Sequence, residues 1–310
     1  MLTFNQNNNI KIASITGGKL NNKKLYISDD NKPQIGEYEE IMKISNNVCK
    51  YCDKKLSRKD HLLEHYNVCK NKIIDDTIKK VKNDIEQNIG NELLITDDGI
   101  ISPEPLPERE TIYIYGKPKS GKSTWIGKYV DKYINENPKK NVYLFSFVEK
   151  DRALSNKKIK RVKIDDTLLT DPITIEELRG EHGCLAIFDD IIDDTAGDKL
   201  NKYLWSLMQA IIRNGRDHED LGRDISIMYT SHTGCNGQKS KLIIKGSTAI
   251  VFFIDGHDAE VDYMLNKYYG IVNKHSRDRI MKLPTRWVTI YKNRPSYLLH
   301  EKGAIMMKNI

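Results

Sequence analysis

The chain has 310 residues, of which 30% are charged and 8% aromatic, and its net charge at pH 7 is +7. This length allows about two domains and one sizeable core. No apolar run approaches the ~18–20 residues that span a bilayer, and no basic-then-apolar leader opens the chain. We therefore expect a soluble intracellular protein with no membrane partner. Its net positive charge is compatible with a polyanionic partner but does not identify one.

Residues 1–45 are polar at their start and then carry two short alternating runs. Lys11–Thr16 and Lys24–Ser28 flank the turn-rich sequence GGKLNN. Alternating apolar residues on both sides of a turn are typical of a β-hairpin. We predict an N-terminal hairpin within an otherwise irregular segment.

Residues 46–71 contain a cysteine and histidine cluster with the spacing C-x2-C-x12-H-x3-C. This spacing falls within the ββα zinc-finger pattern, with cysteine in place of the last histidine. Leu56 and Leu62 occupy the apolar positions of that pattern. The alternative is a chance grouping of four residues. The predicted Zn²⁺ ligands are Cys49, Cys52, His65 and Cys69.

Two interpretations of what the finger contacts stay open. In the finger alignment Arg58, His61 and Glu64 take the helix positions that face DNA bases. His61 lies too close to Cys52 along the chain for a finger ligand. A lone finger covers only about three base pairs. Contact with a protein, or with nucleic acid of any sequence, is therefore the other interpretation.

Residues 72–110 are predicted to form a helix and then a linker. Apolar residues recur at helical spacing through residues 72–90, and Gly90 is placed to end that helix. Ser102–Glu110, with the sequence SPEPLPERE, is acidic and rich in proline, which is typical of a stiff extended linker. The main domain is expected over residues 111–310.

Residues 116–123 read GKPKSGKS and match the P-loop pattern G-x-x-x-x-G-K-[ST]. A β-branched and aromatic run precedes them and a helical pattern follows. Backbone N–H groups of such a loop surround a polyphosphate at the start of a helix. In this pattern Lys122 reaches the β- and γ-phosphates of ATP, and Ser123 binds Mg²⁺. The predicted nucleotide-binding residues are Gly116, Lys117, Pro118, Lys119, Ser120, Gly121, Lys122, Ser123 and Thr124.

Strands and helices then alternate to the end of the chain. Near-continuous apolar strands are predicted at 141–148, 184–190, 224–231 and 248–254, with helices at 200–215 and 259–269 and a hairpin from WVTIYKN and SYLLH. Such strands suit a parallel sheet that is buried on both faces. The predicted fold class is α/β: a P-loop NTPase fold with a mostly parallel sheet flanked by helices, plus the small N-terminal ββα-type zinc finger.

An acidic pair ends one predicted strand, in the sequence CLAIFDDIIDD. Asp189 is predicted to hold Mg²⁺, and Asp190 to orient and polarise the attacking water. An acid directly after the Mg²⁺ ligand favours ATP hydrolysis over the chemistry of the small kinases. Asp193 and Asp194 are interpreted as solvated loop charges.

The strand DISIMYTS is followed by a candidate sensor of the γ-phosphate. Thr230, Ser231 and His232 qualify if their strand lies between the one before the P-loop and the one that ends in the acidic pair. We choose His232 as catalytic, against the alternative of a surface-loop histidine.

The turn RNGRDH carries Arg213 and Arg216 at the end of a predicted helix. In ring-forming ATPases one arginine enters the neighbouring subunit's site and stabilises the charge of the transition state. Arg216 is predicted to take this role. The alternative is a surface arginine that interacts with the helix C-terminus.

The order of motifs resembles that of the FtsK–HerA group of P-loop ATPases. The matching stretches are GKPKSGKSTW, YLFSFVEKD, LAIFDD, RNGRDH, IMYTSHTG and RWVTIYKNRP, within residues 111–295. Inside this group the chain is most similar to the genome-packaging ATPases of large and giant DNA viruses and virophages. The resemblance implies a ring, often a hexamer, that hydrolyses ATP to pump double-stranded DNA. It also implies a place in the host cytoplasm, the viral factory or the virion.

Two departures from this group stand out. Many relatives carry glutamine as the sensor, where this chain offers Ser231 or His232. The zinc finger is an addition, which would direct the motor to DNA or to a capsid protein.

Three functions are weighed on these grounds. The first is ATP-driven translocation of double-stranded DNA in genome packaging. The second is a zinc-finger regulatory or adaptor protein that uses ATP binding as a switch. The third, a nucleotide or polynucleotide kinase, is disfavoured because the sequence has no arginine-rich lid segment and the acidic pair favours water as the nucleophile.

Overall fold

The structure is a computed structural model that describes residues 1–6, 9–28, 91–191, 197–219, 221–235, 237–255, 258–292 and 295–307. The predicted zinc finger, with Cys49, Cys52, His65 and Cys69, lies outside these residues, as does the predicted helix over 72–90. Asp193 and Asp194 also lie outside them. Two cysteines fall in the described part, and both are free thiols: Cys184 is buried and Cys235 is half-buried.

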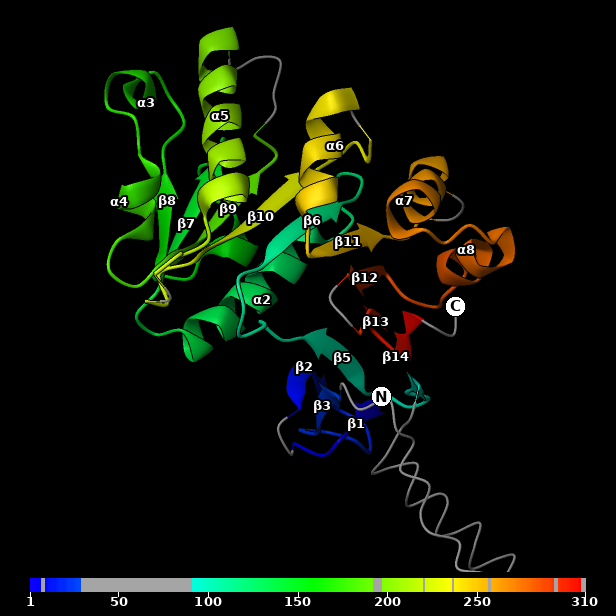
Figure 1. Ribbon diagram of the computed structural model, residues 1–310. Coiled ribbons are helices and arrows are strands. Elements are labelled where there is room, and N and C mark those ends of the chain that lie inside the picture. The colour runs from blue at the N-terminus through cyan, green and yellow to red at the C-terminus, as the bar shows by residue number, and fades with distance from the viewer. Residues whose placement is uncertain are drawn as a thin grey trace, which may run out of the picture.

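Strands and helices alternate through most of the described chain (Figure 1). The strands are β1 (Leu2–Thr3), β2 (Ile10–Thr16), β3 (Lys24–Ile27), β4 (Glu92–Leu94), β5 (Ile100–Pro103), β6 (Thr111–Tyr115), β7 (Asn141–Ser146), β8 (Ile159–Val162), β9 (Cys184–Asp189), β10 (Ile225–Ser231), β11 (Ala249–Phe253), β12 (Trp287–Tyr291), β13 (Tyr297–His300) and β14 (Gly303–Met306). The helices are α2 (Lys122–Glu136), η1 (Arg152–Leu154), α3 (Thr167–Thr170), α4 (Ile175–Arg179), α5 (Asp198–Asn214), α6 (Gly237–Gly246), α7 (Ala259–Tyr269) and α8 (Lys274–Met281).

Among the described residues, ten strands form one sheet in the order β4-β14-β13-β12-β11-β6-β10-β9-β7-β8. The strands from β11 to β8 run parallel to their neighbours. The remaining four extend the sheet as antiparallel strands, and β12 and β13 pair as the terminal hairpin that the sequence predicts. The predicted α/β class with a mostly parallel sheet is confirmed.

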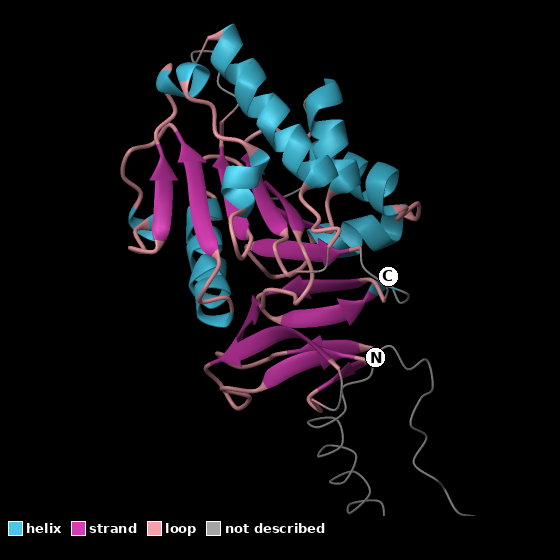
Figure 2. Cartoon of the chain, turned by 60° about the vertical axis from the view of Figure 1, so that its left-hand side comes forward, coloured by secondary structure: helices cyan, strands magenta, loops and turns pink. Residues whose placement is uncertain are grey.

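Alternate residues of the central strands enter two different hydrophobic clusters. Ile112 and Ile114 of β6 pack with α2 and the N-terminal strands, whereas Tyr113 and Tyr115 pack with α5, α6, α7 and α8. Helices cover both faces of the sheet in Figure 2. Because successive side chains of a strand point to opposite faces, a strand covered on both faces must be apolar throughout. This is why the apolar runs in the sequence mark the strands so well.

The N-terminal strands form a second, antiparallel sheet in the order β1-β3-β2-β5. The end of β5 overlaps the predicted linker at Ser102 and Pro103, and β4, which precedes β5 in the chain, pairs with β14 of the large sheet. Proline did not exclude a strand here because Pro103 ends an edge strand, where its missing N–H leaves no gap in the ladder. Residues 91–110 therefore join the two sheets; Ile101 N, for example, donates to Glu301 O at 2.8 Å.

A buried carboxyl lies where this joining segment meets α2. Glu110 is 3% exposed, and its Oε2 accepts hydrogen bonds from the Tyr129 hydroxyl and from Leu106 N, the latter at 3.0 Å. Burial raises the pKa of Glu110 from its ordinary 4.5 to about 7, and the two hydrogen bonds oppose that rise. Between about pH 4.5 and pH 7 the folded chain therefore keeps a proton that the unfolded chain has already released.

We expect Glu110→Gln to remove part of the pH dependence of folding stability. A raised folded-state pKa stabilises the protein at low pH, and this contribution is lost as the pH rises from about 4.5 to about 7. The loss is on the order of 3 kcal/mol of unfolding free energy. Urea unfolding at pH 5 and pH 8 should show a smaller difference in Glu110→Gln than in the wild type. The matched control is Glu104→Gln, since ion pairing with Lys132 lowers the pKa of Glu104 against the effect of its burial. Equal pH slopes in wild type and Glu110→Gln would contradict the assignment.

Candidate nucleotide site

The loop that matches the P-loop pattern joins the carboxyl end of β6 to the first turn of α2. Gly121 stands just before the helix with φ at 106°, where only glycine is unstrained, and Lys119 has φ at 65°. No side chain caps α2, and Trp125 N makes a helical hydrogen bond to Gly121 O at 3.0 Å. The N–H groups of the first turn are therefore directed toward a ligand, as in an anion site at a helix N-terminus.

The side chain of Lys122 packs against this loop. It is nearly buried, and Nζ donates to Gly116 O at 2.6 Å and to His232 Nδ1 at 2.8 Å. Burial lowers the pKa of Lys122, while the charges of Asp190 and Asp189 act in the opposite direction. The ammonium group is thus partly desolvated, which strengthens its attraction for a polyphosphate, and the two carboxylates favour its charged form.

The acidic pair is positioned by β10. This strand lies between β6 and β9, as a γ-phosphate sensor requires. The buried hydroxyl of Thr230 donates to Asp189 Oδ1 at 2.8 Å and accepts from Asp190 N at 2.9 Å. Asp190 itself has φ at 51°, a left-handed conformation that costs free energy in a residue other than glycine. Thr230 therefore orients the acidic pair instead of facing a phosphate.

His232 bridges Asp190 and Lys122. Its Nε2 lies 2.7 Å from Asp190 Oδ2, and its Nδ1 lies 2.8 Å from Lys122 Nζ. Nδ1 also lies 3.1 Å from Gly116 O; an ammonium group only donates hydrogen bonds, so toward Lys122 Nδ1 accepts, which directs an Nε2 proton at Asp190. Ser231, the remaining sensor candidate, donates instead to Thr233 O at 2.8 Å within its own turn.

These groups converge on one pocket of about 600 Å³, which we call the phosphate pocket. It is lined by Lys119, Ser120, Gly121, Lys122, Ser123, Thr124, Phe147, Val148, Asp151, Arg152, Ala153, Asp189, Asp190 and His232. The Ser123 hydroxyl and the Asp189 carboxylate are both hard oxygen donors, which fits the ligand preference of Mg²⁺. Gly116, Lys117 and Pro118 of the predicted set do not line the pocket.

The segment after β7 supplies pocket residues that the sequence analysis did not single out. Phe147, Val148 and Arg152 line the phosphate pocket opposite the P-loop. Their position after a predicted strand could have identified them, because segments at the carboxyl ends of neighbouring parallel strands meet at one edge of the sheet. η1 approaches α2 so closely that a Cβ on Gly127 would lie 2.2 Å from Ala153 O, so Gly127 permits this contact.

Arg216 does not join the other predicted residues in this chain. It is exposed and lies just after α5, where Gly215 O accepts a hydrogen bond from Ile225 N at the start of β10. The P-loop follows the end of β6, which runs parallel to β10. Arg216 and the phosphate pocket therefore lie at opposite ends of the sheet.

The described residues contain no group of three or more His, Cys, Asp or Glu side chains able to hold a metal ion. No helix in this part of the chain is both long enough and apolar enough to cross a membrane.

Comparison with known proteins gives a sequence relative and several solved structures. The protein named "Uncharacterized protein V3" of the Sputnik virophage is 30% identical over 230 residues, which cover 73% of this chain and 89% of that protein. The genome packaging NTPase B204 from Sulfolobus turreted icosahedral virus 2, in complex with AMPPCP, has 12% identity and a TM-score of 0.42, with 63% of this chain and 98% of that chain covered. The pCW3 conjugation coupling protein TcpA has 12% identity and a TM-score of 0.43, covering 95% of this chain and 77% of that chain. No family model matches the chain.

Proposed function

The chain belongs to the family of protein V3 of the Sputnik virophage, and we propose that it hydrolyses ATP to translocate double-stranded DNA during packaging of a viral genome. One observation supports hydrolysis above all: Lys122, the acidic pair and His232 line the same pocket beside the P-loop. The order of motifs, with its resemblance to the FtsK–HerA group, supports the DNA-pumping role. Membership of a family with a virophage protein supports the viral setting, in the viral factory or host cytoplasm.

Each group that lines the phosphate pocket has its own role in the hydrolysis. The amides of the P-loop and Lys122 bind the β- and γ-phosphates of ATP and stabilise the charge that develops on them. Asp190 accepts a hydrogen bond from the attacking water and polarises it, and His232 holds the Asp190 carboxylate in place through Nε2. Ser123 and Asp189 would hold Mg²⁺, which neutralises phosphate charge when it is bound.

ATPase measurement with and without double-stranded DNA tests this function. The purified, zinc-loaded protein should form a ring, which light scattering detects as a particle several times the mass of one chain. Addition of double-stranded DNA should raise its rate of ATP hydrolysis. Oligomeric protein that hydrolyses ATP at the same rate with and without DNA would contradict translocation. If the protein binds ATP but does not hydrolyse it, the result favours the second function, a zinc-finger protein that uses ATP binding as a switch.

We place Arg216 in the neighbouring subunit's site, because it is exposed and lies far from the phosphate pocket of its own chain. Arg216→Ala and Lys122→Ala rings should each be inactive. Mixed rings should regain part of the activity, since the first subunit keeps its P-loop and the second supplies Arg216. The control is Arg213→Ala, which removes the nearby exposed arginine and should leave hydrolysis unchanged. Mixed rings that form but stay inactive would contradict the role in trans.

We also propose that Cys49, Cys52, His65 and Cys69 bind one structural Zn²⁺, and that this finger contacts DNA or a capsid protein. The four side chains match the donor set and spacing of a finger, although they lie outside the described residues. Elemental analysis should find one zinc per chain. Cys49→Ser combined with Cys69→Ser should abolish it, whereas Cys235→Ser, which changes a free thiol elsewhere, should not. Undiminished zinc in the double variant would contradict the assignment.

A further inference from the structure

A second pocket of about 330 Å³ lies on the other side of the first turn of α2, and we call it the tryptophan pocket. It shares Ser120, Gly121 and Thr124 with the phosphate pocket. The two pockets therefore meet at the P-loop. A ligand whose phosphates lie in one can extend around the start of α2 into the other.

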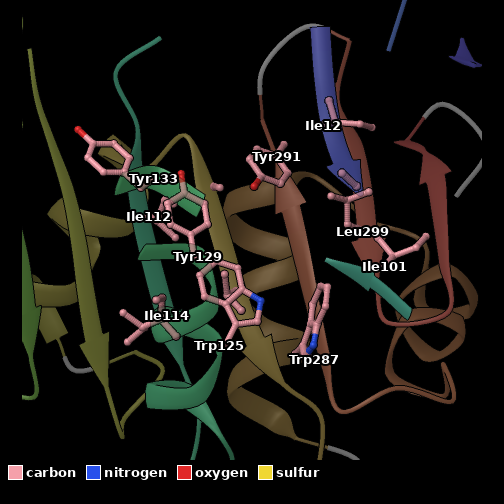
Figure 3. Close-up of a cluster of buried hydrophobic side chains, with 14 of the residues drawn as sticks. Ile12, Ile101, Ile112, Ile114, Trp125, Tyr129, Tyr133, Trp287, Tyr291 and Leu299 are labelled. Carbon is pink, nitrogen blue, oxygen red and sulfur yellow. The ribbon is translucent and has the colours of Figure 1, made fainter. Parts of the chain in front are cut away.

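The walls of the tryptophan pocket are largely aromatic. Trp125 of α2 stacks on Tyr129 with ring centroids 5.5 Å apart, and meets Trp287 of β12 edge-on at 6.3 Å. Phe253 from the end of β11 and Pro103 from β5 also line it. Figure 3 shows Trp125 and Tyr129 on α2 facing Trp287 across this region. Flat aromatic walls of this kind suit a planar ring.

Two residues that line this pocket carry a buried hydrogen-bond donor without a partner among the described residues. The donors are the indole Nε1 of Trp125, a residue that is 6% exposed, and the hydroxyl of Ser120. In Figure 3 the indole nitrogen of Trp125 points to the side of Trp287. A buried donor left unpaired costs free energy, so most buried donors are paired. An acceptor atom on a bound ligand would satisfy these two.

The charges around the tryptophan pocket argue against a second phosphate. Arg286 Nε donates to Glu301 Oε1 at 2.8 Å, and Lys132 Nζ donates to Glu104 Oε1 at 2.8 Å. These two cations thus have carboxylate partners within the fold, and the third basic residue of the lining, Lys128, is exposed. What the pocket offers a ligand is aromatic surface and hydrogen-bond donors, which suits an uncharged ring with acceptor nitrogens.

We propose that the tryptophan pocket is the nucleobase subsite, and that it takes the purine ring of the nucleotide whose phosphates the P-loop holds. The proposal rests on the proposed function of the phosphate pocket. The purine stacks on the ring of Trp287, to which Trp125 stands at 75°, and its ring nitrogens accept from Trp125 Nε1. β5 and Thr16 of β2 also line the pocket, so the N-terminal sheet contributes one wall of the subsite.

Binding of ATP and of inorganic tripolyphosphate, measured by titration calorimetry, separates the subsite from the P-loop. Trp287→Leu should weaken ATP about tenfold or more, the usual effect of losing one stacking partner of a base, and leave tripolyphosphate affinity unchanged. Trp125→Phe keeps an aromatic ring but lacks the N–H. It should lower the affinity for ATP by a smaller factor and leave the affinity for tripolyphosphate unchanged. Trp205→Phe changes the tryptophan on α5, outside the tryptophan pocket, and should change neither affinity.

Intrinsic fluorescence gives a second readout. ATP should quench tryptophan emission in the wild type and in Trp205→Phe, because Trp125 and Trp287 remain. If neither pocket variant changes ATP affinity while the wild type binds ATP, the subsite is wrong and the P-loop site stands. Equal weakening of ATP and tripolyphosphate also overturns the subsite. A wild type that binds neither ligand overturns the proposed function itself.

Discussion

Asp190→Asn is expected to lower the rate of ATP hydrolysis by roughly 10²- to 10⁴-fold while ATP binding stays nearly unchanged. Asparagine keeps the size of the side chain but cannot polarise water as a carboxylate does. It also tolerates the left-handed backbone that Asp190 adopts, since asparagine is enriched at positive φ. The loss should therefore reflect the missing charge and not a displaced loop.

Single-turnover hydrolysis and equilibrium binding of ATP, measured on the same preparation, test this expectation. The control is Asp255→Asn, which removes an exposed carboxylate that pairs with Lys117 at 3.0 Å beside the same loop. That variant should hydrolyse ATP at the wild-type rate. Hydrolysis by Asp190→Asn within a few fold of wild type would rule Asp190 out as the group that polarises water.

Lys122→Ala is expected to remove both tight ATP binding and hydrolysis. The loss of one charged donor to the phosphates should lower kcat/KM by roughly 10²- to 10³-fold or more. Folding stability should change little by comparison, because burial already disfavours the charged form of Lys122 in the folded chain. Calorimetric titration with ATP and thermal unfolding without nucleotide measure the two effects separately.

The matched control for Lys122→Ala is Lys139→Ala, which removes an exposed lysine beyond the far end of α2. Its ATP affinity and its hydrolysis rate should equal those of the wild type. If Lys122→Ala still binds ATP with wild-type affinity, the P-loop is not the phosphate site. If it unfolds without nucleotide, the lysine has a structural role that its contacts with Gly116 O and His232 would then explain.

Local patterns predicted the central part of the fold because those patterns follow directly from burial. Residues 184–190 and 248–254 were recognisable as strands since a strand covered on both faces must be apolar at every position. The P-loop was recognisable because its glycines and its lysine lie together in the sequence. No comparable run marks β4 and β5, which are three and four residues long; β5 follows Gly99 and ends at Pro103.

The side-chain arrangement of the phosphate pocket could be predicted only in part. Asp189, Asp190 and His232 were singled out because each follows an apolar strand. The choice of His232 over Thr230 and Ser231 had no local pattern to support it, since three successive residues at a strand end differ in direction and the turn after the strand decides which one faces the pocket. The hydrogen bonds of Thr230 to the acidic pair and of Ser231 to its own turn leave His232 facing Lys122.

The sequence by itself determined the α/β class, the P-loop and the acidic pair, because strand burial and phosphate binding each depend on residues close together in the chain. Only the tertiary structure decided what distant segments do to one another. It set β10 between β6 and β9, brought residues 147–152 to the P-loop, and put Arg216 at the far end of the sheet. It also joined β5 to Trp125 and Trp287 around the tryptophan pocket. The physical reason is that strand order and packing arise from contacts between residues tens to hundreds of positions apart, and no local pattern encodes them.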